Sequence, residues 1–120
     1  MPHLTLEYSR NLTSLDADRM LLALNRQLAE SGHFAENDIK SRAIALDHYR
    51  TGIEPVARAF VHVTLAILSG RTPEAKQALS AGLLAVLQQA GLGLPGAEVQ
   101  LSVEIRDLDR ASYSKAVLVG

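Results

Sequence analysis

The opening stretch PHLTLEY, residues Pro2–Tyr8, alternates apolar and polar side chains, which is typical of a β-strand with one buried face. Its pattern returns later in the chain, since HLTL at His3–Leu6 matches HVTL at His62–Leu65. Each copy is followed by a segment of helical periodicity and then by a second β-prone run. The repeat therefore predicts two βαβ units, about residues 2–47 and 59–106.

In the first unit, a helix is expected over residues 14–31, because apolar side chains recur there on one face. Thr13 or Ser14 is expected to cap its start. Gly32 provides a stop signal, and the run IKSRAIAL over residues 39–46 predicts the second strand.

The second unit begins after residues 47–58, which are expected to form a loop or a short hairpin arm. The run FVHVTLAI over residues 60–67 predicts the third strand. A helix follows over residues 73–90, with Thr72 as its N-cap. Alternation over residues 99–105 then predicts the fourth strand.

Right-handed crossovers would place both helices on one face of a single four-stranded sheet, giving an α/β (α+β) fold. The strand residues expected to face the helices are Leu4, Leu6, Val61, Val63, Leu65, Ile67, Val99, Leu101, Val103 and Ile105. The other face would carry mainly polar residues, with no helix left to cover it. This face either contacts water, as in some antiparallel sheets, or packs against other copies of the chain. Because Phe60 and Ala66 lie on it and parallel-type strands are rarely left bare, packing against other copies is expected.

At 120 residues the chain suits one domain, 1–120, with a C-terminal segment over residues 107–120. The formal net charge of −1 gives no reason to expect nucleic acid or an anionic membrane as partner. The sequence has no cysteine, no signal-like start and no apolar run of membrane-spanning length. A cytoplasmic protein is therefore expected.

Pro2 directly follows Met1 and is a small second residue of the kind from which methionine is usually trimmed. Trimming would leave a secondary amine at the start of the first strand. An α-amino group titrates just above neutrality, and burial or a nearby guanidinium lowers its pKa further. Such an amine is a candidate general base for proton abstraction next to a carbonyl. The alternative is that Pro2 only begins a strand, where its missing N–H costs nothing.

Three cations are candidates for binding anions. Arg71 lies between a strand end and a capped helix start, where free N–H groups and the helix dipole favour a carboxylate. Lys40 and Arg42 project from one face of the second strand and form a second anion clamp, suited to a substrate with two carboxylates. Alternatively, Arg71 is a solvated loop residue, and the other two reach water from the end of a strand.

The histidines raise the question of a metal site; they are His3, His33, His48 and His62. His3 and His62 occupy matching strand positions, but two ligands without local spacing fall short of a recognisable site. Structural or interface roles are expected instead, with Glu7 and Glu104 as partners on the polar face. No glycine-rich phosphate loop or Ser/His/Asp arrangement is readable. No metal and no cofactor are expected.

The segment ILSGRTPEAK, Ile67–Lys76, resembles the strand-end, arginine and helix-start element of 4-oxalocrotonate tautomerase. The chain as a whole resembles the 5-carboxymethyl-2-hydroxymuconate Δ-isomerase family, which has close counterparts of PHLTLEYSRNL, SGHF, KSR and AFVHVTLAILSGR. The resemblance runs from Pro2 to about Gln89 and weakens beyond, although the last strand still fits.

The resemblance implies the tautomerase superfamily, with two fused βαβ units, a homotrimer and an amino-terminal proline as general base. It implies a cofactor-free reaction on a small dicarboxylate in the breakdown of homoprotocatechuate. Pro2 would take a proton from a 2-hydroxymuconate-type dienol and return it at another carbon. Arg71 falls on the family's arginine that contacts a substrate carboxylate.

One position departs from the family, which has two arginines where this chain has Lys40 and Arg42. Lys40 replaces the arginine usually assigned to catalysis and keeps the charge without the planar fork. The resemblance thus assigns catalysis to Pro2, Lys40 and Arg71, and substrate binding to Arg42 and Arg71. Two alternatives are a non-catalytic trimeric binding protein and a tautomerase-fold enzyme acting on a different unsaturated acid.

Overall fold

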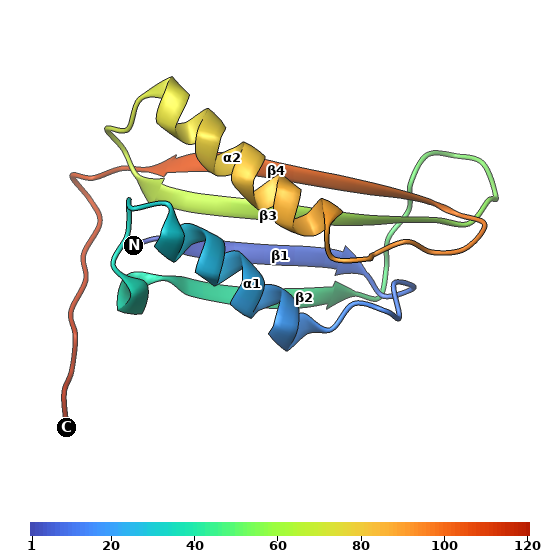
Figure 1. Cartoon of the computed structure of the whole chain (residues 1–120), viewed down its shortest axis with the longest axis horizontal. Coiled ribbons are helices and arrows are strands. Elements are labelled where there is room, and N and C mark those ends of the chain that lie inside the picture. Colours follow the sequence, from blue (N-terminus) through green and yellow to red (C-terminus); the bar gives the residue numbers. More distant parts are fainter.

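A computed structural model describes residues 1–120 and contains one mixed sheet with two helices (Figure 1). The elements in chain order are β1 (His3–Ser9), α1 (Ala17–Glu30), the 3₁₀ turn η1 (Glu36–Asp38), β2 (Lys40–Leu46), β3 (Arg58–Leu68), α2 (Pro73–Gln88) and β4 (Glu98–Leu108). The strand order is β2-β1-β3-β4. β1 runs parallel to β2, β3 runs parallel to β4, and β1 and β3 are antiparallel. The predicted α+β fold is confirmed.

Both helices cover the same face of the sheet, and the core lies between these two layers (Figure 1). The helix-facing residues of the two central strands are fully buried: Leu4, Leu6, Val61, Val63, Leu65 and Ile67. The helices contribute Met20, Leu24, Leu28, Leu79, Leu83 and Leu87. The apolar residues of β4 that were expected here also pack against the core, but as an outer strand they stay partly buried.

The start of α1 differs from the prediction. The helix begins at Ala17, and its N-cap is Asp16, whose carboxylate accepts the Arg19 N–H at 3.2 Å. The predicted caps, Thr13 and Ser14, instead lie in a turn closed by a bond of 3.2 Å between the Leu15 N–H and the Leu12 carbonyl. Because Leu12 and Leu15 are both buried there, this turn packs into the core before the helix begins.

The other boundaries move by one to three residues. α2 ends at Gln88, short of residue 90, while β4 extends to Leu108 because it stays paired with β3 along its whole length. The Thr72 cap is confirmed, since its hydroxyl accepts the Ala75 N–H at 3.1 Å. Residues 47–57 form an irregular loop without a hairpin, and η1 was not foreseen.

Ser9 is a buried polar residue at the end of β1. The β1–β3 pairing stops at Tyr8 and Val61, and beyond it the Ser9 hydroxyl accepts the Phe60 N–H at 3.0 Å. The side chain therefore replaces a backbone partner where the two strands separate.

The helix-free face carries a linked polar group on β3 and β4. Nε2 of His62 donates to the Glu104 carboxylate at 2.8 Å, and Nδ1 lies 2.7 Å from the Ser102 hydroxyl. Arg106 donates to the same carboxylate at 3.1 Å. The hydrogen bonds from Arg106 and then His62 lower the pKa of Glu104 to about 2.

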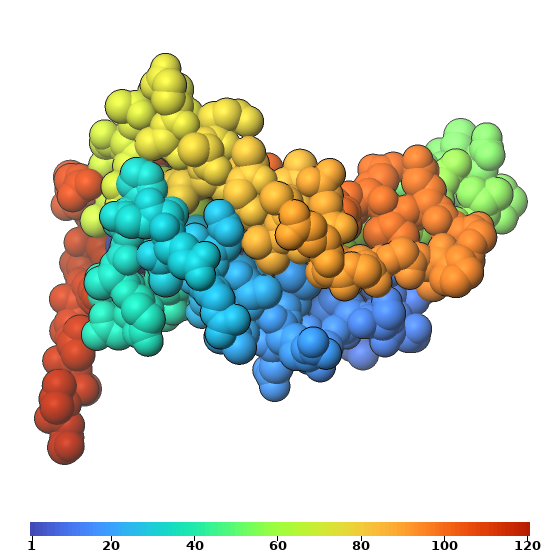
Figure 2. Space-filling model, viewed as in Figure 1, coloured from blue at the N-terminus to red at the C-terminus, as the bar shows by residue number.

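After β4 the chain runs as an extended tail past the N-terminus and away from the body (Figures 1 and 2). Its last apolar residues are exposed: Val117, Leu118 and Val119. No helix in the structure combines the length and the apolar character that crossing a membrane requires.

Candidate active site

The strand directions bring four chain segments to one edge of the sheet. β1 and β2 begin at this edge, while β3 and β4, which run the opposite way, end there. In Figure 1 the N-terminus, η1 and the base of the C-terminal tail all lie at this end of the molecule. Pro2 and Lys40 stand at the two strand starts, and Arg71 follows the end of β3.

Pro2 and Lys40 are neighbours through the backbone. The Lys40 N–H donates to the Pro2 carbonyl at 3.1 Å, and His3 is the residue paired with Lys40 in the sheet. The Pro2 side chain is fully buried, whereas the Lys40 side chain is half-buried. The amino-terminal end of the chain is thus fixed next to a cation.

The amino group at this edge belongs to Met1, one residue before Pro2, and its pKa is lowered to about 6. The main cause is burial, which disfavours the charged ammonium form. A hydrogen bond with Lys40 and the charges of Lys40 and Lys115 act in the same direction, while Asp38 opposes them. An amine in this environment is largely neutral at pH 7.

Lys40 and Arg42 lie on the helix-free face of β2, beside His3 and Thr5 of β1. The pKa of His3 is lowered, mainly by burial and then by the charges of Lys40, the Met1 amine and Arg42. The charges of Lys40 and Arg42 thus act on the same neighbouring residue. Arg42 is exposed. The predicted cationic pair is therefore present on one face, with Lys40 next to the Met1 amine.

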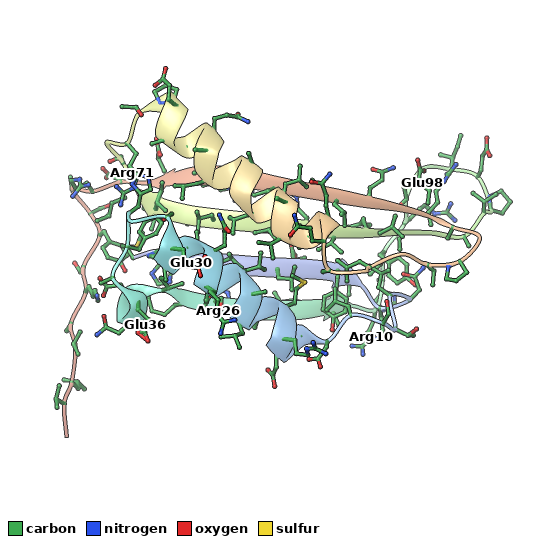
Figure 3. The ribbon with its side chains drawn as sticks, in the orientation of Figure 1. Arg10, Arg26, Glu30, Glu36, Arg71 and Glu98 are labelled. Atoms are coloured by element: carbon green, nitrogen blue, oxygen red, sulfur yellow. The ribbon has the colours of Figure 1, made fainter.

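Arg71 lies at the same end of the molecule, between β3 and α2 (Figure 3). Its guanidinium carbon stands 4.8 Å from the centre of the Phe34 ring, and Nη2 donates to the His33 carbonyl at 3.2 Å. Its Nε is buried without a hydrogen-bond partner. Arg71 is thus held by the loop after α1, a contact that the sequence did not reveal.

The matching histidines do not meet. His62 pairs with Glu7 across the sheet, whereas His3 pairs with Ala66 at the other end of β1. Each has its own partner, Tyr113 for His3 and the Ser102–Glu104 group for His62. No group of three or more histidine, aspartate or glutamate side chains is arranged to hold a metal ion.

Side chains of the tail also reach this edge, among them Tyr113 and Lys115. The Tyr113 hydroxyl and His3 Nε2 share a hydrogen bond of 2.9 Å, and Lys115 donates to Asp38 at 2.6 Å. Neither was a predicted site residue, because each contact joins positions far apart in the sequence, without a local motif.

A hollow of about 590 Å³ lies between α1 and η1, with Arg26, Glu30 and Glu36 among its lining residues (Figure 3). The lining residues include neither Pro2 nor Arg71. The candidate catalytic residues therefore lie on the sheet edge rather than in this hollow.

A family model described as 5-carboxymethyl-2-hydroxymuconate isomerase matches residues 2–118. This chain belongs to the 5-carboxymethyl-2-hydroxymuconate isomerase family. The crystal structure of a 5-carboxymethyl-2-hydroxymuconate isomerase from Deinococcus radiodurans R1 is 35% identical, with a TM-score of 0.85, over 96% of this chain and 88% of that chain. The protein is accordingly an isomerase, and the match includes most of the tail.

More distant structures share the fold of this isomerase. A 5-carboxymethyl-2-hydroxymuconate delta-isomerase is 18% identical with a TM-score of 0.71, over 98% of this chain and 88% of that chain. A symmetric trimer of fused wild-type 4-OT is 20% identical with a TM-score of 0.68, over 95% of this chain and 91% of that chain. No curated protein sequence matches the chain.

Proposed function

We propose that this isomerase moves a proton within an unsaturated 2-hydroxymuconate-type dicarboxylate, with Pro2 as general base and without a cofactor. The supporting observation concerns the amine of Met1, the residue before Pro2. This amine is partly buried beside Lys40, and its pKa is lowered to about 6. Removal of Met1 turns the Pro2 nitrogen from an amide, which cannot accept a proton, into an amine. This amine lies one residue further along the chain, in a fully buried residue whose carbonyl accepts the Lys40 N–H, so burial and the Lys40 charge are expected to lower its pKa as well.

The reaction needs only a proton and an electron pair to move. The neutral Pro2 amine takes the proton of the 2-hydroxyl group, and the oxygen lone pair forms the ketone. The electrons of the conjugated double bonds shift to a distal carbon, which receives the proton back from Pro2. All atoms balance, because the base is regenerated.

The cations near Pro2 have separate roles in this scheme. Lys40 stabilises the negative charge that develops on the dienolate, as fixed cations do at developing oxyanions. Arg42 and Arg71 bind substrate carboxylates. Arg71 suits this role because its guanidinium lies over the Phe34 ring and the His33 carbonyl accepts a hydrogen bond from Nη2 only, which leaves Nη1 without a partner in the chain.

The helix-free face supports a homotrimer in which the sheets of three copies face one another. Phe60, Ala66 and Leu68 lie on this face among its polar residues, and no helix of the chain covers them. The trimer found for the fused 4-OT structure is consistent with this assembly. A role in the catabolism of homoprotocatechuate follows from the proposed substrate.

The test is an ultraviolet assay of the ketonisation of 5-carboxymethyl-2-hydroxymuconate, together with the intact mass of the protein. Protein lacking one methionine should accelerate the reaction above the buffer rate, and Pro2→Ala should lower kcat by about 100-fold or more. Arg71→Ala should mainly raise KM. Processed but inactive protein would favour a different unsaturated acid, an alternative that Lys40 in place of arginine supports. Retained Met1 without turnover would favour a binding protein.

A further inference from the structure

The tail crosses the sheet edge at three successive points. Arg110 donates twice to the Ser69 carbonyl, at 3.1 and 2.9 Å, just after β3. Tyr113 then bonds to His3 at the start of β1, and Lys115 bonds to Asp38 just before β2. These contacts follow the spatial order of the strands, β3, β1 and β2. We call residues 110–115 the strap.

The strap brings the Lys115 ammonium to the edge that carries Pro2. Asp38 lies two residues before Lys40, whose N–H bonds to Pro2. The Lys115 charge also contributes, after burial and Lys40, to the lowered pKa of the Met1 amine, which lies one residue before Pro2 at this edge. The tail thus adds a third cation beside Lys40 and Arg42.

The Lys115–Asp38 pair leaves the ammonium available to an incoming anion. An ammonium has three N–H donors, and Asp38 is the only hydrogen-bond acceptor that Lys115 contacts. The two side chains are 36% and 38% exposed. Because both groups are exposed and solvent screens their attraction, a substrate carboxylate can compete with Asp38 for the ammonium.

We propose that Lys115 is a substrate-binding residue of the Pro2 site, delivered by the strap, and that it binds the second carboxylate of a dicarboxylate. Asp38 holds the ammonium in place until the substrate arrives. This inference rests on the proposed function, because it assigns Lys115 to the same substrate.

The test is calorimetric binding of trans,trans-muconate and of sorbate, which shares the six-carbon diene but has one carboxylate. Lys115→Met should weaken muconate binding by about tenfold, equivalent to one charge-assisted contact, and should leave sorbate binding unchanged. Lys115→Arg should restore muconate binding. The matched control is Lys76→Met, since Lys76 forms a similar pair with Asp107 on the helix side, at 3.3 Å.

The variant Asp38→Asn distinguishes a role of Lys115 in substrate binding from a purely structural role of the Lys115–Asp38 pair. Removing the competing carboxylate should tighten muconate binding by roughly threefold, whereas a structural pair would lose stability in both Asp38→Asn and Lys115→Met. The inference is overturned if Lys115→Met binds muconate with the wild-type affinity, or if its affinities for muconate and sorbate fall by the same factor. It is also overturned if the wild-type protein does not bind muconate more tightly than sorbate. Since binding needs no proton transfer, absent turnover contradicts only the proposed function.

Discussion

The Lys40 N–H donates to the Pro2 carbonyl at 3.1 Å, so the proposed base and the cation beside it are joined by a backbone bond between β1 and β2. The relative position of these two backbone segments is therefore set by the sheet. The Lys40 ammonium in turn helps to keep the amine at this edge neutral.

Lys40→Met should move the acid limb of the kcat/KM profile to higher pH. Burial, and then the hydrogen bond and charge of Lys40, lower the pKa of the Met1 amine. We expect the same causes to act on the Pro2 amine once Met1 is removed, so without Lys40 the pKa of the base should rise toward the ordinary value of about 8. The base is inactive when protonated, so activity is lost below its pKa and the loss should begin at a higher pH in the variant. Lys76→Met should keep the wild-type profile. An unchanged limb in Lys40→Met would contradict the role of Lys40.

Phe34→Leu should raise KM several-fold with little change in kcat. The ring lies 4.8 Å from the Arg71 guanidinium, and a cation over an aromatic face gains about 0.5–2 kcal/mol. Without the ring, Arg71 loses the surface that orients it toward a substrate carboxylate. Phe34→Tyr keeps the ring and should behave like wild type. Equal KM values for the two variants would show that the stacking does not position Arg71.

Ser9→Ala should lower the free energy of unfolding by about 1–3 kcal/mol, the usual cost of a buried donor without a partner. The affected donor is the Phe60 N–H, which the Ser9 hydroxyl accepts at 3.0 Å. Ser14→Ala is the control, because Ser14 is exposed and should change stability by less than about 0.5 kcal/mol. Urea denaturation measures the free energy of unfolding of both variants. Equal losses of stability in Ser9→Ala and Ser14→Ala would contradict the role of Ser9.

Glu104 should make the fold sensitive to acid. Its pKa is lowered from 4.5 to about 2 in the folded chain by Arg106 and His62. A carboxylate with a depressed folded pKa stabilises the fold above its unfolded pKa, and this contribution is lost as pH falls from about 5 toward 2. Glu104→Gln should flatten the dependence of Tm on pH in that window. Glu98→Gln, at the other end of β4, should keep the wild-type dependence of Tm on pH. The same wild-type dependence in Glu104→Gln would contradict the proposed role of Glu104.

The sequence was sufficient to predict the sheet and both helices because their signals are local. Alternation marks β1, and the Thr72 cap marks the start of α2. That Lys40 and Arg42 share one face followed from their spacing along the strand, whereas their place on the helix-free face did not.

The remaining features depend on contacts between distant segments. Arg71 stacks on Phe34 of the preceding unit, and the tail contacts connect Tyr113 and Lys115 to the first strand and to η1. No local pattern encodes such pairs. The start of α1 was misplaced because burial of Leu15 in the preceding turn outweighed the capping propensity of nearby hydroxyl residues.

The most direct test of Pro2 as the base is a ¹⁵N NMR titration of protein labelled with ¹⁵N-proline. The mechanism predicts a Pro2 nitrogen that titrates as an amine with a pKa below the ordinary α-amino value of about 8, and that shifts upward in Lys40→Met. A Pro2 nitrogen that behaves as an amide at every pH would contradict the mechanism, because Met1 would then still be attached.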